Sequence, residues 1–451
     1  MASKFEAEVG RLMMQFNTPG VAVEMRAGGK RHSAHMGRLS HGGHHPLTQK
    51  TRFPTVCLIK LLIAIDLLVL SEKGQISLDD RIADHLPELA NGPTAKGKFL
   101  KIRHLLSHTG GFRSVMLERL LQLAQDSWQN CVDLLHDTAQ LFEPGMVFED
   151  DHLSHIILGE LLSRLRGKPV MDVVTEDVLA PLGIRPGHRT RDAEQPEFYS
   201  SRHEWVRTEK RWQAEPDVYA APNPSFGAIS PLSMTSANLM RLGEALLDEP
   251  AAGQTIITPW VREKLFSEVV RVPREISPIR VTRWHLAAFG MGMATFRGGH
   301  RGFVTTGRGQ NTSIVFDNGR QSVLTTSMNS TNILEREAIL NALFAKFAGD
   351  SSIVPEPQTI DIGFDEFLQP FTTRDIAGVY VGFTPDPVEI FAKPRSFVVR
   401  IGKEERYQFE ASPQNRLVMR ARMPVPIGVF QDPASLRPCL TLGMHPYKKV
   451  G

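Results

Sequence analysis

The chain has few cysteines, no run of basic residues and no long apolar segment. Its 451 residues include Cys57, Cys131 and Cys439, which are too few and too scattered for a disulfide framework. The formal net charge is only +3, so nucleic acid and anionic membranes are poor partners. The longest apolar run, residues 58–70, is broken by Lys60 and Asp66 and predicts a buried helix rather than a membrane span.

Signals for export and for cofactor binding are also missing. The first 20 residues contain no apolar signal core, and together with the cysteine usage this predicts a cytoplasmic location. No phosphate loop or dinucleotide-binding glycine pattern occurs, so no cofactor is expected. The histidines between residues 32 and 45 have no acidic or cysteine partner at ligand spacing, so no metal is predicted either.

The periodicity of the chain predicts an α+β fold. Residues 20–51 have the pattern of a strand hairpin, with its turn at Gly28-Gly29, and residues 57–73 have helical spacing that ends at Gly74. Residues 152–166, 236–247 and 335–347 are further helical stretches, whereas residues 303–306, 313–316 and 322–326 resemble strands. This order predicts one antiparallel sheet that is shared by the N- and C-terminal parts of the first domain.

Length and composition predict more than one domain. We expect a catalytic domain over residues 1–350, which contains a helical subdomain. Residues 351–370 are rich in proline, acids and loop residues and are expected to form a linker. Short strand patterns dominate residues 371–451, which predicts a small C-terminal β domain.

Four segments carry the chemistry. They are Cys57-Leu58-Ile59-Lys60 with its sequel Gly74–Asp80, Ile102–Gly111, Pro144–His152, and Gly299-His300-Arg301-Gly302. Together they resemble the superfamily of serine β-lactamases and penicillin-binding proteins, in its branch of class C β-lactamases, esterases, peptidases and acyltransferases. The resemblance implies a β-lactamase-like antiparallel sheet flanked by helices, and the C-terminal part is similar in kind to the lipocalin-like domain of some members.

Cys57 stands where the family has its nucleophilic serine, and Asp150 and His152 stand where it has tyrosine and asparagine. A thiol ordinarily has a pKa of about 8.5, and the ammonium of Lys60 one helical turn away would lower it. Cys57 is therefore the predicted nucleophile, and a buried structural cysteine is the alternative. His152 could transfer protons in a relay with Asp150. The alternative is that residues 149–151 form a solvated acidic turn.

The resemblance also implies roles for residues near His300. His300 is expected to point into the reaction site, and the backbone N–H groups of Cys57 and Phe303 are expected to form an oxyanion hole. Arg301 and Gly302 are candidate substrate-binding residues, although a surface role for Arg301 is the alternative. His104 and His108 are expected to be structural, and Cys131 and Cys439 to be packing residues.

The sequence therefore predicts a covalent acyl-transfer enzyme, an acyltransferase, cyclase or thioesterase of biosynthetic metabolism, that forms a cysteine thioester. The substrate would be a small-molecule ester, amide or thioester, and a carrier protein or coenzyme A could hold the acyl group. One alternative is a non-catalytic binding protein that retains the fold. Another is carbon–carbon bond chemistry on an acyl intermediate. The sequence does not indicate an oligomeric state.

Overall fold

The computed structural model describes most of the chain in two compact units. The described residues are 3–55, 57–90, 99–113, 128–138, 140–188, 199–206, 209–214, 232–247, 256–272, 275–276, 283–307, 309–353, 368–382, 386–411, 417–421, 427–442 and 445–450. The first unit contains residues 1–77, 156–267 and 291–355, and the second contains residues 78–155, 268–290 and 356–451. Among the described residues, no helix is long and apolar enough to cross a membrane.

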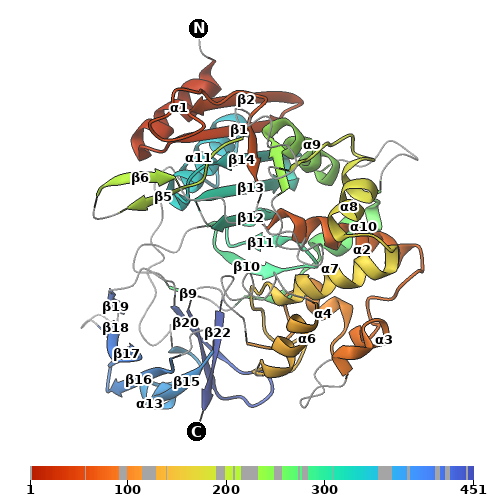
Figure 1. Cartoon of the computed structure of the whole chain (residues 1–451). Helices are drawn as coiled ribbons and strands as arrows, with labels where there is room; N and C mark the ends of the chain where they lie inside the picture. The colour runs from red at the N-terminus through yellow and green to blue at the C-terminus, as the bar shows by residue number, and fades with distance from the viewer. Residues whose placement is uncertain are drawn as a thin grey trace. The chain divides into compact units, whose positions relative to one another are not determined.

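An antiparallel sheet forms the centre of the first unit (Figure 1). Its strands there follow the order β2-β1-β14-β13-β12-β11. Their bounds are β1 Gly20–Ala27, β2 Lys30–Gly37, β11 Ala294–Phe296, β12 Arg301–Gly307, β13 Gln310–Asp317 and β14 Ser322–Met328. Val21 of β1 pairs with Met328 of β14, so the two ends of the unit's sequence meet in the sheet, as predicted.

Helices cover the two faces of this sheet. On one face lie α2 (Leu58–Glu72), α9 (Ser236–Leu247) and α10 (Pro259–Phe266). A Cβ built on Gly243 of α9 would meet Ile314, and Phe266 of α10 packs edge-on against Phe316. On the other face lie α1 (Lys4–Phe16) and α11 (Ile333–Phe347), where Arg336 donates to Thr306 Oγ1 and Asn311 Oδ1.

Smaller elements complete the first unit. They are β3 Arg52–Pro54, β4 Gly187–His188 and β7 Leu232–Thr235, which form a three-stranded sheet, the hairpin β5 His203–Val206 and β6 Arg211–Ala214, the helix α8 Val170–Val174 and the π-helix η3 Thr175–Leu179. The helix α7 (Leu153–Arg166) begins in the second unit and continues in the first.

A second antiparallel sheet of nine strands dominates the second unit, in the order β19-β18-β17-β16-β15-β22-β21-β20-β9. Their bounds are β9 Glu275–Ile276, β15 Gly378–Val381, β16 Val388–Lys393, β17 Ser396–Ile401, β18 Glu404–Ala411, β19 Leu417–Ala421, β20 Ile427–Gln431, β21 Pro438–Leu442 and β22 His445–Val450. A buried cluster that includes Tyr380, Phe397 and Phe409 forms its core. The predicted C-terminal β domain is therefore confirmed.

Short helices make up the rest of the second unit. They are α3 Ile82–His85, η1 Pro87–Ala90, α4 Ile102–Leu106, α6 Trp128–Asp137 and α13 Thr373–Ile376. The unit also contains the strands β8 Val270–Arg271 and β10 Leu286–Phe289, which pair antiparallel. The structure thus groups residues 78–155 with the C-terminal strands, whereas the sequence analysis assigned them to the first 350 residues. Most of the predicted linker, residues 354–367, lies outside the described residues.

Candidate active site

Cys57 lies directly before the first turn of α2. It is the N-cap residue of this helix, its side chain is partly exposed, and it makes no capping hydrogen bond to the helix. Thr55 holds the preceding chain in place, because its backbone N–H and its hydroxyl both donate to the carbonyl of Leu232, at 2.8 and 2.9 Å. The thiol therefore sits where the positive end of a helix dipole stabilises an anion.

Lys60 follows Cys57 by one helical turn, and its backbone N–H donates to the Cys57 carbonyl at 2.9 Å. Its side chain is buried. Residues 58–70 of α2 are all buried, which confirms the prediction of a buried helix. Lysines are seldom buried, so Lys60, one turn from Cys57, is unusual in this helix, as is the buried Asp66.

The residues proposed to bind substrate lie at the start of β12. Arg301 pairs with Phe316 and Phe303 with Ile314, so Arg301 and Phe303 share the sheet face that α9 and α10 cover. Gly302 points the other way, and a Cβ there would lie 2.2 Å from the Ile314 carbonyl oxygen. Close packing of β12 on β13 therefore requires glycine at position 302, whatever its part in binding.

His300 does not lie where the sequence analysis expected it. Its imidazole is buried against Phe344 of α11, with 4.8 Å between the ring centroids, and its Nε2 is 3.3 Å from Asp350 Oδ2. The physical reason is that His300 lies just before β12, where its contacts with Phe344 and Asp350 place its ring on the α11 side of the sheet. His300 therefore faces α11, on the opposite side of the sheet from α10, and has no part in the proposed reaction.

Asp150 and His152 belong to the second unit. Oδ1 of Asp150, a side chain that is 35% exposed, lies 3.8 Å from Nε2 of His108. Glu149 and Asp151 are buried on either side of it, so the alternative of a solvated acidic turn fails for these two residues. Asp151 caps the start of α7, where its carboxylate accepts from the backbone and the hydroxyl of Ser154. The proposed relay through His152 stays a prediction.

His108 lies beside the candidate residue Asp150, a proximity that was not predicted from the sequence. Its backbone has a positive φ of 55°, and its ring packs against Phe148, Phe289 and His155. The backbone N–H of Asp151 donates to Nδ1 at 3.3 Å, which leaves Nε2 as the protonated nitrogen that faces Asp150. The two adjacent acids Asp150 and Asp151 were the only feature of the sequence that could have suggested a nearby histidine partner.

His104 has the structural role that was predicted for it. Its Nδ1 accepts the backbone N–H of Lys101 at 3.2 Å and so caps α4. Burial, followed by the charges of Lys101 and Arg103, lowers its pKa to about 4. His104 is therefore neutral near pH 7 and a poor general base.

The other two thiols differ from Cys57. Cys131 in α6 and Cys439 in β21 are buried, as predicted for packing residues. Burial raises the pKa of Cys439 to about 12, so this thiol is protonated at neutral pH. Cys57 alone among the three cysteines combines partial exposure with a helix N-terminus.

Comparisons with known proteins agree with this fold. The profile of the Beta-lactamase family matches residues 5–346, and the chain belongs to this family. Penicillin-binding protein 4 of Amycolatopsis lactamdurans is 27% identical over 175 residues, which are 38% of this chain and 45% of that protein. Esterase EstB of Burkholderia gladioli is 26% identical over 202 residues, which are 41% of this chain and 50% of the esterase. The chain thus spans about half the length, or less, of these relatives.

Solved structures extend the likeness to the whole fold. The structure named SurE has a TM-score of 0.76 at 18% identity and covers 99% of this chain and 98% of its own. An octameric penicillin-binding protein homologue from Pyrococcus abyssi has a TM-score of 0.66 at 16% identity, with coverage of 98% and 99%. Both include the C-terminal β domain in the match. This fold is the one that the sequence predicted.

Proposed function

We propose that this protein is a covalent acyl-transfer enzyme in which Cys57 is the nucleophile. The observation that carries the proposal is the position of Cys57, partly exposed at the N-terminus of α2 with the buried Lys60 one turn further on. A helix N-terminus and a neighbouring cation both favour the thiolate, which is the reactive form of cysteine. Family membership supports the choice of an acyl substrate, since the named relatives include an esterase.

In the proposed reaction, the Cys57 sulfur attacks a carbonyl carbon. A carbon–sulfur bond forms, and the bond to the leaving group breaks as that group takes up a proton. Water or an amine then attacks the thioester, the carbon–sulfur bond breaks, and the thiolate returns. We assign the oxyanion hole to the backbone N–H groups of Cys57 and Phe303, and each such donor contributes about 3–4 kcal/mol to transition-state stabilisation.

Proton transfer is assigned to His152 as the proposed acid and base, with Asp150 as the proposed negative charge of the relay. Oδ1 of Asp150 lies 3.8 Å from Nε2 of His108. Arg301 is the proposed contact for a carboxylate on the substrate, since it shares a sheet face with Phe303. Thiols exchange readily with thioesters, so we propose an acyl group that is held on coenzyme A or a carrier protein. A biosynthetic role is part of the same proposal.

The experiment is intact-mass spectrometry after incubation with a panel of acyl donors, namely an acetyl thioester of N-acetylcysteamine, p-nitrophenyl acetate and an acyl amide. We expect one acyl group per chain, bound to Cys57, and no adduct in Cys57→Ala. Cys131→Ala is the matched control and keeps the adduct, because that thiol is buried. Absence of any adduct across the panel, or an adduct that persists in Cys57→Ala, would overturn the proposal. The first result would favour the non-catalytic binding protein.

A further inference from the structure

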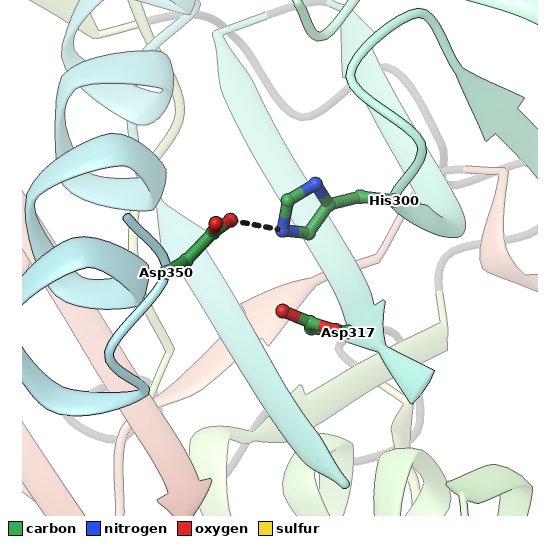
Figure 2. A group of neighbouring side chains, drawn as sticks. All are labelled: His300, Asp317 and Asp350. Carbon is green, nitrogen blue, oxygen red and sulfur yellow. Dashed lines mark ion pairs between the residues drawn. The ribbon is translucent and has the colours of Figure 1, made fainter. Parts of the chain in front are cut away.

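Three side chains from distant parts of the sequence meet on the α11 side of the first unit's sheet (Figure 2). His300 precedes β12, Asp317 ends β13, and Asp350 follows α11. One ligand atom from each lies within 4.8 Å of the other two, and all three residues are buried. In the described part of the chain, no other group of three or more histidine, cysteine or carboxylate side chains meets this criterion.

The spacing of these atoms fits a metal ion better than a direct ion pair. His300 Nε2 and Asp350 Oδ2 are 3.3 Å apart, whereas a charge-assisted hydrogen bond has a length of about 2.7–2.9 Å. Two ligands of a tetrahedral zinc ion, each about 2.0–2.1 Å from the metal, are separated by about 3.3 Å. The third atom, an Asp317 carboxylate oxygen, lies within 4.8 Å of the other two.

Neighbouring groups orient the two carboxylates. Arg320 Nη1 is 2.6 Å from Asp317 Oδ2, and its Nη2 is 3.4 Å from Asp350 Oδ1. Ser352 donates its backbone N–H and its hydroxyl to Asp350 Oδ1, which leaves Oδ2 directed at His300. Such outer contacts orient metal ligands.

The chemistry of the three side chains also suits a metal ion. A neutral imidazole with two carboxylates is a donor set that suits zinc and similar divalent transition metals.

We propose that His300, Asp317 and Asp350 bind one divalent transition-metal ion of the zinc class. The ion fastens the turn before β12 and the end of β13 to the segment that follows α11. The site is separate from Cys57, since α2 and α10 cover the opposite face of the sheet. Its three ligands lie too far apart in the sequence to form a spacing motif, and the sequence analysis for that reason predicted no metal.

The experiment uses full-length chelator-treated protein in a Cys57→Ala background, so that the exposed thiol does not bind metal. Zinc chloride is titrated into the protein. Equilibrium dialysis gives the number of bound zinc ions per chain, and thermal denaturation gives the unfolding midpoint. We expect one zinc ion per chain and a rise of about 3–5 °C in the unfolding midpoint. His300→Ala and Asp350→Asn should lose both effects. His85→Ala is the matched control and should keep the bound zinc and the rise in the unfolding midpoint, because His85 and Asp80 together provide only two possible metal ligands.

Cobalt provides a second measurement that does not depend on how well the variants fold. Cobalt(II) bound to the parent protein should give visible absorption bands of a tetrahedral site, and zinc should displace them. No stoichiometric metal in the parent protein would overturn the proposal and would leave an ion pair between a protonated His300 and Asp350. Metal binding that survives in a folded His300→Ala variant would overturn it as well.

Discussion

Glu335 makes the stability of this protein depend on pH in a direction that can be measured. It lies in the first turn of α11, and its backbone N–H donates to the N-cap residue Asn332 at 3.1 Å. Its side chain is fully buried, and burial raises its pKa from 4.5 to about 8. The folded protein therefore holds a proton on Glu335 between these two values, whereas the unfolded chain has released it.

The sign follows from this difference in bound protons. As the pH rises from about 4.5 to 8, the contribution of Glu335 to the free energy of unfolding falls by about 1.4 kcal/mol per pH unit, or about 4–5 kcal/mol in all. Glu335→Gln keeps the shape of the side chain and cannot ionise. We expect the variant to be more stable than the wild type at pH 8.5, with the gain disappearing near pH 5.

The assay is urea denaturation of both proteins across pH 5–8.5. Glu263→Gln is the matched control, because the Glu263 side chain is 64% exposed, and its profile should follow the wild type. Parallel profiles for Glu335→Gln and the wild type would refute the reasoning.

Three further predictions follow from the same contacts. Gly302→Ala should lower the temperature midpoint of unfolding, because the new Cβ would lie 2.2 Å from the Ile314 carbonyl oxygen. Gly307→Ala on the same strand should leave the midpoint unchanged, because no atom lies within 4 Å of a Cβ there. Equal midpoints for the two variants would contradict this prediction. Leu62→Ala in the buried helix α2 should cost about 2–5 kcal/mol in the free energy of unfolding, and a loss below about 1 kcal/mol by urea denaturation would count against the packing. Burial and then the charge of Asp177 raise the pKa of Asp66 to about 6, so this residue lowers stability as the pH rises from about 4 to 6. Asp66→Asn should make the fall in stability over this range shallower, and an unchanged slope would disprove the role of Asp66.

Local patterns in the sequence predicted the main elements well. The hairpin of residues 20–51 contains β1 and β2, and the helical spacing of residues 57–73 corresponds to α2. The helix predicted over residues 236–247 has the bounds of α9. These predictions hold because each depends on a period of about two or 3.6 residues, which the sequence carries directly. The helix α1 was not predicted, although Ser3 and Glu6 form a capping box at its start.

Predictions that depend on long-range geometry were weaker. The face of the sheet that His300 occupies depends on the register of β12 against β13, and no local pattern determines that register. The resemblance to the β-lactamase family identified Cys57 and Lys60, because they lie one turn apart in a recognisable segment. Asp317 and Asp350 lie in no segment that resembles the family, so the sequence did not single them out.

The reactivity of the three thiols tests the central claim most directly. The measurement is the rate of iodoacetamide modification of each cysteine at pH 6–9, resolved by peptide mass spectrometry, in the wild type and in Lys60→Met. Cys57 should react at least about tenfold faster at pH 7 than a free thiol with a pKa of about 8.5, and Lys60→Met should lower that rate. Cys131 and Cys439 should stay unmodified in the folded protein. A Cys57 that reacts no faster than a free thiol, or that is unaffected by the loss of Lys60, would contradict the account.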